Sequence, residues 1–253
     1  MHCRERPHSR LGCLSLKSPV TSPVGAVQAA IVAEAKAFPS AGGEAPTLAA
    51  AAVARALPLR FWVWIAFALL YGICETLFGN WGTVYLHQQR ALPDATANLA
   101  LAVFWAAVTF GRLLVAVISA RVPPLVIFRA LPVLIAVALV CVALSSSAAF
   151  GVAAFALAGL ACSACLPLSI VTASSETPRF VETVSGWMVA SYMMGYGIGA
   201  FAVGPLRQLA DLALSDVYLG ATAVAVVLIL LANLLARGAH AADPSFLKPG
   251  TRS

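Results

Sequence analysis

Six long apolar runs constrain this chain more than any other feature of its sequence. They lie near residues 61–86, 97–120, 124–145, 148–174, 183–206 and 215–236. Each run reaches the roughly 20 residues that an α-helix needs to cross about 30 Å of hydrocarbon. The runs are continuous and lack the alternation of barrel strands, so helices are the structure that can satisfy their backbone in lipid. The pattern predicts an all-α membrane protein with six transmembrane helices.

Composition agrees with this prediction and argues against other classes. Of the 253 residues, 61% are hydrophobic and 10% are charged, whereas about 25% are charged in an ordinary soluble domain. The formal net charge is +6, but the basic residues lie mostly at the edges of apolar runs, so we expect no nucleic-acid partner. The chain has no Gly-x-x-x-x-Gly-Lys phosphate loop, and no histidine falls within a run. We therefore expect a non-enzyme without metal or cofactor, whose partners are the lipid bilayer and a small-molecule substrate.

The composition also divides the chain into three parts. Residues 1–58 are rich in Arg, Ser, Pro and Ala, and predict a disordered, low-complexity cytoplasmic leader or linker. Residues 59–237 form the predicted six-helix transmembrane domain, and residues 238–253 form a cytoplasmic tail. On the leader's side the runs are flanked by Arg55, Arg60, Arg121, Arg129, Arg179, Arg237, Lys248 and Arg252. Only Arg90 and Arg207 flank the other side, and this asymmetry predicts cytoplasmic termini in a plasma (inner) membrane.

The six runs differ in a pattern that repeats after three. The third, "LPVLIAVALVCVAL", and the sixth, "LGATAVAVVLILLANLLA", are almost purely aliphatic. The other four carry nearly all of the polar residues, glycine and proline. This three-plus-three repeat predicts that the aliphatic helices face lipid and that the other four share an interior.

The first run carries the strongest candidate for function, in the stretch "YGICETLFGNWGTVYL". At 100° per residue Tyr71, Glu75 and Tyr85 share one helical face, Trp81 lies at its edge and Asn80 points away. A charge at mid-membrane costs about 2.5–3.5 kcal/mol. Glu75 is therefore predicted to bind a substrate or a proton in a polar interior; the alternative is a protonated or paired carboxylate that fixes packing.

The second run contains another charge, Arg112, on the same predicted face as Thr109. An arginine stays charged, so it needs an acceptor or water. Two roles remain open for Arg112. It either pairs with Glu75 or holds helix termini and loop carbonyls on the inner side.

The fourth and fifth runs contain helix-bending and close-packing residues. Pro167 should kink the fourth helix. Gly195 and Gly199 would let another helix approach closely, and the Gly204-Pro205 pair favours bending. Tyr192 and Tyr196 could reach the interior. The predicted substrate and ion pathway comprises Tyr71, Glu75, Asn80, Trp81, Tyr85, Thr109, Tyr192 and Tyr196.

These residues resemble a known family. The six-run block is similar to the C-terminal half of a major facilitator superfamily transporter. The pattern Tyr71-Gly72, Glu75, Gly79-Asn80-Trp81 and Tyr85-Leu86 resembles the seventh helix of the fucose- and glucose-permease-like branch. The stretch "GRLLVAVISARVPP" is similar to the superfamily's cytoplasmic loop signature, with matches at Gly111, Arg112 and Arg121. The acidic residue that is usual in this signature is absent, and Ser119-Ala120 stand near its place.

The resemblance implies half of a twelve-helix transporter fold, with substrate bound between two six-helix halves. We expect this chain to be a fragment, or to work with a complementary half or a second copy. The expected function is secondary active transport of a small, sugar-like solute by alternating access, with Arg112 supporting the inner gate. The alternative is a non-transporting membrane scaffold or regulatory half-transporter.

Overall fold

The computed structural model describes residues 58–242, with side chains as far as Arg237. The predicted leader and most of the predicted tail lie outside the described residues. Within them every regular element is helical, and six helices are long and apolar enough to cross a membrane. The elements are α3 (Leu59–Gly79), α4 (Gly82–Val84), the π-helix η1 (Tyr85–Gln89), α5 (Asp94–Ile118), α6 (Pro124–Ala143), α7 (Ala148–Cys162), α8 (Cys165–Glu176), the 3₁₀ helix η2 (Pro178–Phe180), α9 (Val181–Ala210) and α10 (Leu214–Ala242).

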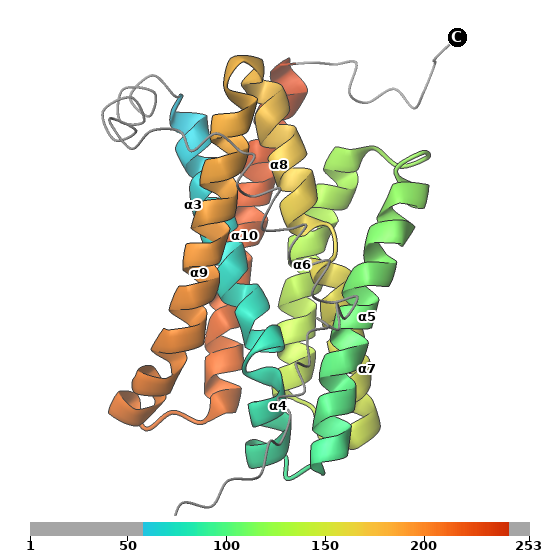
Figure 1. Ribbon diagram of the computed structural model, residues 1–253, viewed down its shortest axis with the longest axis vertical. Coiled ribbons are helices and arrows are strands. Elements are labelled where there is room, and N and C mark those ends of the chain that lie inside the picture. Colours follow the sequence, from blue (N-terminus) through green and yellow to red (C-terminus); the bar gives the residue numbers. More distant parts are fainter. Residues whose placement is uncertain (1–57, 243–253) are drawn as a thin grey trace, which may run out of the picture. The chain divides into compact units, whose positions relative to one another are not determined.

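The six candidate spans cross the bundle one after another, in alternating directions (Figure 1). We call the end where α3 begins the near end and the opposite end the far end. The first crossing runs from α3 through α4 and η1, and the fourth combines α7 with α8. Short turns join the crossings, so consecutive helices run antiparallel, and the predicted all-α membrane fold with six transmembrane helices is confirmed.

The first and fourth crossings are interrupted, whereas the sequence patterns predict one continuous helix for each. The first breaks at Asn80–Trp81, where Gly79 and Asn80 are both poor helix formers. The fourth breaks at Ser163–Ala164, one turn before Pro167. Since proline has no N–H and clashes with the carbonyl four residues earlier, the predicted kink becomes a break.

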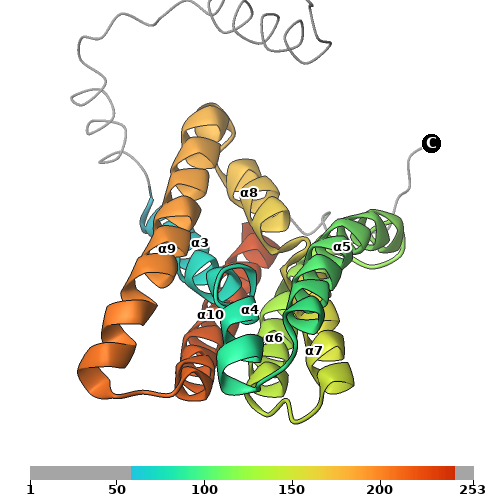
Figure 2. The ribbon, with the colours of Figure 1, turned by 60° about the horizontal axis from the view of Figure 1, so that its bottom comes forward.

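Helix packing follows the three-plus-three repeat. The most extensive contacts join α3 with α9, α5 with α7, and α6 with α10. Each crossing of the first half corresponds to the crossing three positions later, so α3 corresponds to α7, α5 to α9 and α6 to α10. Under this correspondence the α3–α9 contact matches the α7–α5 contact, and the α6–α10 contact matches itself. Two apolar cavities are related by the same correspondence between the halves. One of about 310 Å³ lies between α5, α6 and α7, and one of about 280 Å³ lies between α3, α9 and α10. In Figure 2 the α5–α7 and α3–α9 pairs lie on either side of α6 and α10.

Glycines allow the closest of these approaches. A Cβ atom on Gly195 of α9 would collide with the backbone of Leu69 in α3, and one on Gly72 would collide with the carbonyl of Tyr192. In the equivalent pair, a Cβ on Gly159 of α7 would collide with the Phe104 carbonyl of α5. Backbone-to-backbone contact of this kind is how helices associate in lipid, where the hydrophobic effect between helices is absent.

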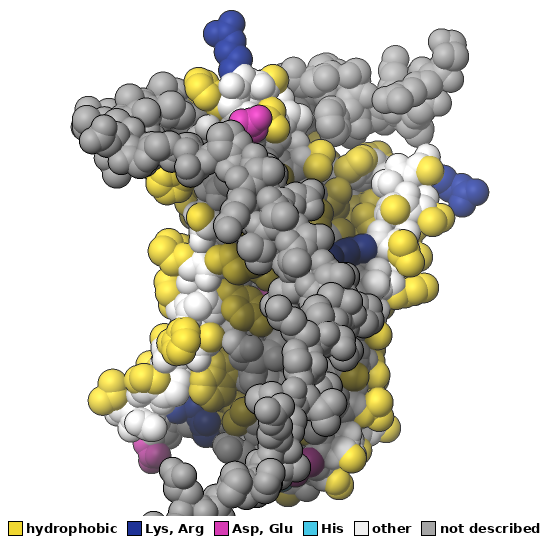
Figure 3. All heavy atoms as spheres, viewed as in Figure 1, with side chains coloured by type: hydrophobic (Ala, Val, Ile, Leu, Met, Phe, Trp, Pro, Cys, Tyr) yellow, Lys and Arg dark blue, Asp and Glu magenta, His cyan; other side chains and the backbone are white. Residues whose placement is uncertain are grey.

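The helices differ in how far they are buried: α3 is central, whereas α5 and α9 are open to the outside of this unit. Inside this unit 61% of the apolar window of α3 is buried, against 17% for α5 and 22% for α9. Figure 3 shows these two helices covered largely by hydrophobic side chains. The most open helices are therefore two of the four that the sequence assigns to a shared interior. That α6 and α10 face lipid stays a prediction.

Candidate functional site

Glu75 lies deep in the bundle, about 24 Å along α3 from its start at a rise of about 1.5 Å per residue. Its side chain is buried, with 5% of the residue exposed. The side chains of Tyr71 and Tyr192 are neighbours of its carboxyl group. The two tyrosine rings stack with centroids 5.6 Å apart. Glu75 thus meets phenol hydroxyls, and no arginine or lysine of residues 58–237 forms an ion pair with it.

The break in the fourth crossing lies beside Glu75. Pro167 cannot donate a hydrogen bond to the Ser163 carbonyl, and the interruption also releases the Cys162 carbonyl. Tyr71 donates to the Cys162 carbonyl at 2.8 Å. The Arg112 Nε donates to the Ser163 carbonyl at 3.2 Å. Side chains from α3 and α5 therefore satisfy the backbone groups that the break exposes, as a broken helix within a membrane requires.

This geometry bears on the two roles left open for Arg112. Arg112 forms no ion pair with Glu75. Its direct partner is the carbonyl at the end of α7. The second role, in which Arg112 holds a helix terminus, agrees with the structure. Of the other signature positions, Gly111 packs against Ser163, and Arg121 is exposed in the turn after α5.

The break in the first crossing is held against α9. The Trp81 indole donates to the Gly199 carbonyl at 3.1 Å. The Asn80 amide donates to the Thr76 hydroxyl at 3.1 Å, and Tyr196 donates to the Asn80 carbonyl oxygen at 3.4 Å. Gly204 and Pro205 lie inside α9, which runs without a break to Ala210.

Two predicted pathway residues lie away from Glu75. Tyr85 belongs to a far-end cluster, where it donates to the Ala143 carbonyl at 3.0 Å and accepts from Arg90 Nε at 2.8 Å. A terminal nitrogen of Arg90 also donates to the Ala143 carbonyl. The break at Asn80–Trp81 ends the 100° spacing that would have placed Tyr85 on the same helical face as Glu75. Thr109 is on the open face of α5 and bonds back to the Trp105 carbonyl at 3.1 Å.

Three cysteines also lie near the break. Cys74, Cys162 and Cys165 are buried and unoxidised. No set of three His, Cys, Asp or Glu side chains within the described part of the chain could hold a metal ion. These cysteines act there as small packing residues.

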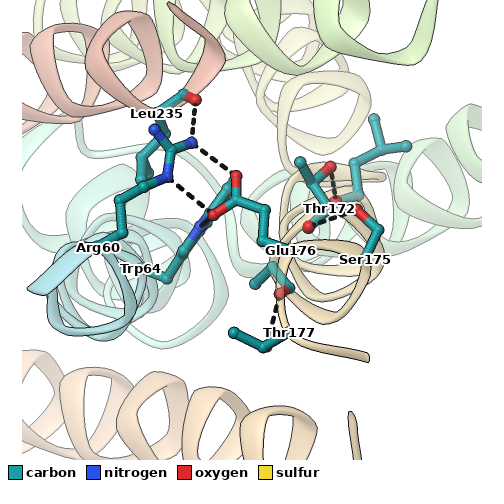
Figure 4. Close-up of polar contacts among 9 residues, drawn as sticks. Arg60, Trp64, Thr172, Ser175, Glu176, Thr177 and Leu235 are labelled. Carbon is teal, nitrogen blue, oxygen red and sulfur yellow. Dashed lines mark hydrogen bonds and ion pairs between the residues drawn. The ribbon is translucent and has the colours of Figure 1, made fainter. Parts of the chain in front are cut away.

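A second carboxylate, Glu176, is the centre of a cluster that the sequence did not suggest. Arg60 of α3 binds it through two nitrogens, at 2.8 Å and 2.6 Å, and donates to the Leu235 carbonyl of α10 at 2.6 Å. The Trp64 indole donates to the same carboxylate at 3.2 Å. Figure 4 shows the side chain of Glu176 between α8 and Arg60, with Trp64 beside it. This near-end cluster (Arg60, Trp64, Glu176 and the Leu235 carbonyl) joins the first, fourth and sixth crossings.

The positions of Arg60 and Glu176 in the sequence do not indicate that the two residues pair. Arg60 has the position of an ordinary flanking charge, and Glu176 lies in a polar turn signal. The two residues are 116 positions apart. A signal was nevertheless present, since Glu176 is the only acidic residue within the "SSETPRF" turn at the end of the fourth run.

One of three comparisons with known proteins found a match. The family model described as "Major Facilitator Superfamily" matches residues 18–200, well over half of the 253-residue chain. The comparisons with curated proteins and with solved structures found no match. The match agrees with the six spanning helices, their three-plus-three packing and the paired helix breaks. The chain belongs to the major facilitator superfamily of membrane transporters.

Proposed function

We propose that this chain is a secondary active transporter, or the C-terminal half of one, that moves a small solute by alternating access. The substrate lies at Glu75, between the breaks in the first and fourth crossings. Paired interruptions in corresponding halves of a repeat are typical of midplane binding sites in secondary transporters. The family membership supports transport as the activity.

One observation carries this proposal, which is the surroundings of Glu75. A buried carboxyl group in a spanning helix is costly, and selection retains it where it has a task. Its neighbours are tyrosine hydroxyls rather than a cation. A carboxyl group with hydroxyl neighbours and no paired cation can exchange a proton or accept a hydrogen bond from a solute hydroxyl. The tyrosines and Trp81 fit a sugar-like solute by hydrogen bonding and stacking.

The open faces of α5 and α9 support a partner for this half. Arg112 and Thr109 are exposed there at membrane depth, and a charged side chain is disfavoured against acyl chains. A complementary six-helix half or a second copy would cover them and close the site. The basic residues at the near end favour cytoplasmic termini in the inner membrane.

The experiment is uptake into membrane vesicles that contain the chain, with and without a complementary half. Wild type is expected to accumulate a candidate solute, and the Glu75→Gln variant is expected to lose that accumulation. Equal uptake by the two would remove Glu75 from the mechanism.

The same open faces also favour a second candidate, a regulatory or scaffold half that binds another membrane protein and moves no solute. In that case Glu75→Gln would change partner binding, measured by co-purification, and no solute flux would depend on it.

A further inference from the structure

We propose that Arg112 binds the carboxylate of the transported solute, which makes the substrate a small hydroxylated carboxylate such as a sugar acid. This inference rests on the proposed transport function and narrows its substrate class. It follows from three features of Arg112: its unused donors, the absence of a counter-charge, and its position relative to the tyrosines around Glu75.

The guanidinium group has donors to spare. Nε is used by the Ser163 carbonyl, and neither terminal nitrogen has a partner among residues 58–237. Arg112 lies about 9 Å before the end of α5. Helical side chains lean toward the N-terminus of their own helix, which for α5 is the far end. The free fork of Arg112 is therefore directed from the inner third of α5 toward mid-membrane.

The described residues supply no counter-charge for it. Glu176 is held by Arg60, and Glu75 makes no ion pair. The other acidic residues of that range lie at or near helix ends: Asp94, Glu182, Asp211 and Asp216. A permanently charged guanidinium in a membrane requires an anionic or strongly polar acceptor. The flat two-nitrogen fork matches a carboxylate in particular.

The groups around Glu75 complete the match. The rings of Tyr71, Tyr192 and Tyr196 lie next to one another. Tyr71 and Arg112 donate to the adjacent carbonyls of Cys162 and Ser163, so the fork lies close to these tyrosines. Hydroxyl-binding groups on one side and a carboxylate-binding fork on the other select a solute that carries both functions. A neutral sugar would leave the fork without an acceptor, so it would gain no charge-assisted bond from Arg112.

The test compares gluconate with glucose, since the two differ mainly in the carboxylate. The purified full chain in lipid nanodiscs is titrated with each, and binding is followed by thermal stabilisation and by competition in vesicle uptake. We expect gluconate to bind at least about tenfold more tightly than glucose, as expected for a charge-assisted pair. Arg112→Gln should remove this preference, and Arg112→Lys should retain part of it.

Because Arg112 also holds the Ser163 carbonyl, the Gln variant could fail by unfolding, and a second background separates the two roles. Pro167→Ala restores a backbone N–H that can bond to that carbonyl. If Arg112 binds substrate, adding Arg112→Gln to the Pro167→Ala background still abolishes the gluconate preference while the protein stays folded. If the double variant prefers gluconate as strongly as Pro167→Ala alone, Arg112 is structural and this inference is wrong.

Two further outcomes keep this inference distinct from the proposed function. Glucose uptake that depends on Glu75 but not on Arg112 would agree with the proposed transport function. It would overturn the inference that the substrate carries a carboxylate. Binding of neither probe, together with an acidic residue of a partner half cross-linked to a cysteine at position 112, would assign the fork to that partner and overturn the substrate role.

Discussion

Glu75 and Glu176 are carboxylates in the same bundle, and their surroundings are opposite. Glu176 receives two hydrogen bonds from Arg60 and one from Trp64, and the same arginine extends to the end of α10. Glu75 is more deeply buried, yet its neighbours are tyrosine hydroxyls. A carboxylate that is paired with an arginine of another helix holds the two helices together. A carboxylate without such a partner is available to a ligand or a proton.

The largest expected effect concerns the packing that holds Tyr192 against Glu75. Gly195→Ala should destabilise the protein by about 3 kcal/mol, because its Cβ would collide with the rigid backbone at Leu69. Thermal unfolding in detergent measures this loss. Gly197→Ala is the matched control, since a Cβ there meets no atom within 4 Å. Equal effects of the two substitutions would show that α3 and α9 do not approach as closely as described.

The next effect tests Glu176 as a structural carboxylate. Glu176→Ala should cost about 2 kcal/mol, between the values for exposed and for buried ion pairs, because the Arg60 and Glu176 side chains are 33% and 15% exposed. A double-mutant cycle with Arg60→Ala, read by thermal unfolding, isolates the pair from other changes. A coupling energy near zero would mean that this pair contributes nothing to the near end.

A smaller effect separates charge from geometry in the same cluster. Arg60→Lys keeps the positive charge but removes the planar fork that reaches both Glu176 and the Leu235 carbonyl. We expect a loss of about 1 kcal/mol in unfolding free energy. Full stability of the lysine variant would show that only the charge matters.

Much of the fold could be predicted from the sequence, since length and hydropathy alone select six spanning helices. The three-plus-three repeat and the weak point at Pro167 could also be predicted. The break at Asn80–Trp81 could not, because a 100° rotation per residue assumes a helix that continues. That assumption placed Tyr85 on the helical face of Glu75, whereas the structure places it with Arg90 and Ala143.

The candidate site was predictable in its centre and not in its supports. Glu75 and Arg112 are conspicuous because charges are rare in apolar runs. The bond from Arg112 to Ser163 and the pairing of Arg60 with Glu176 join residues that are 51 and 116 positions apart. Periodicity within one helix carries no information about which face of another helix lies opposite. These contacts required the packed bundle.

The most direct measurement compares Glu75→Gln with Glu176→Gln in one preparation, recording both solute uptake in vesicles and thermal unfolding. We predict that Glu75→Gln abolishes uptake while its unfolding temperature stays within about 2 °C of wild type. Glu176→Gln should lower the unfolding temperature by several times that shift. If Glu75→Gln gives the larger fall in unfolding temperature, and Glu176→Gln stops uptake at an unchanged unfolding temperature, the roles assigned to the two carboxylates are reversed.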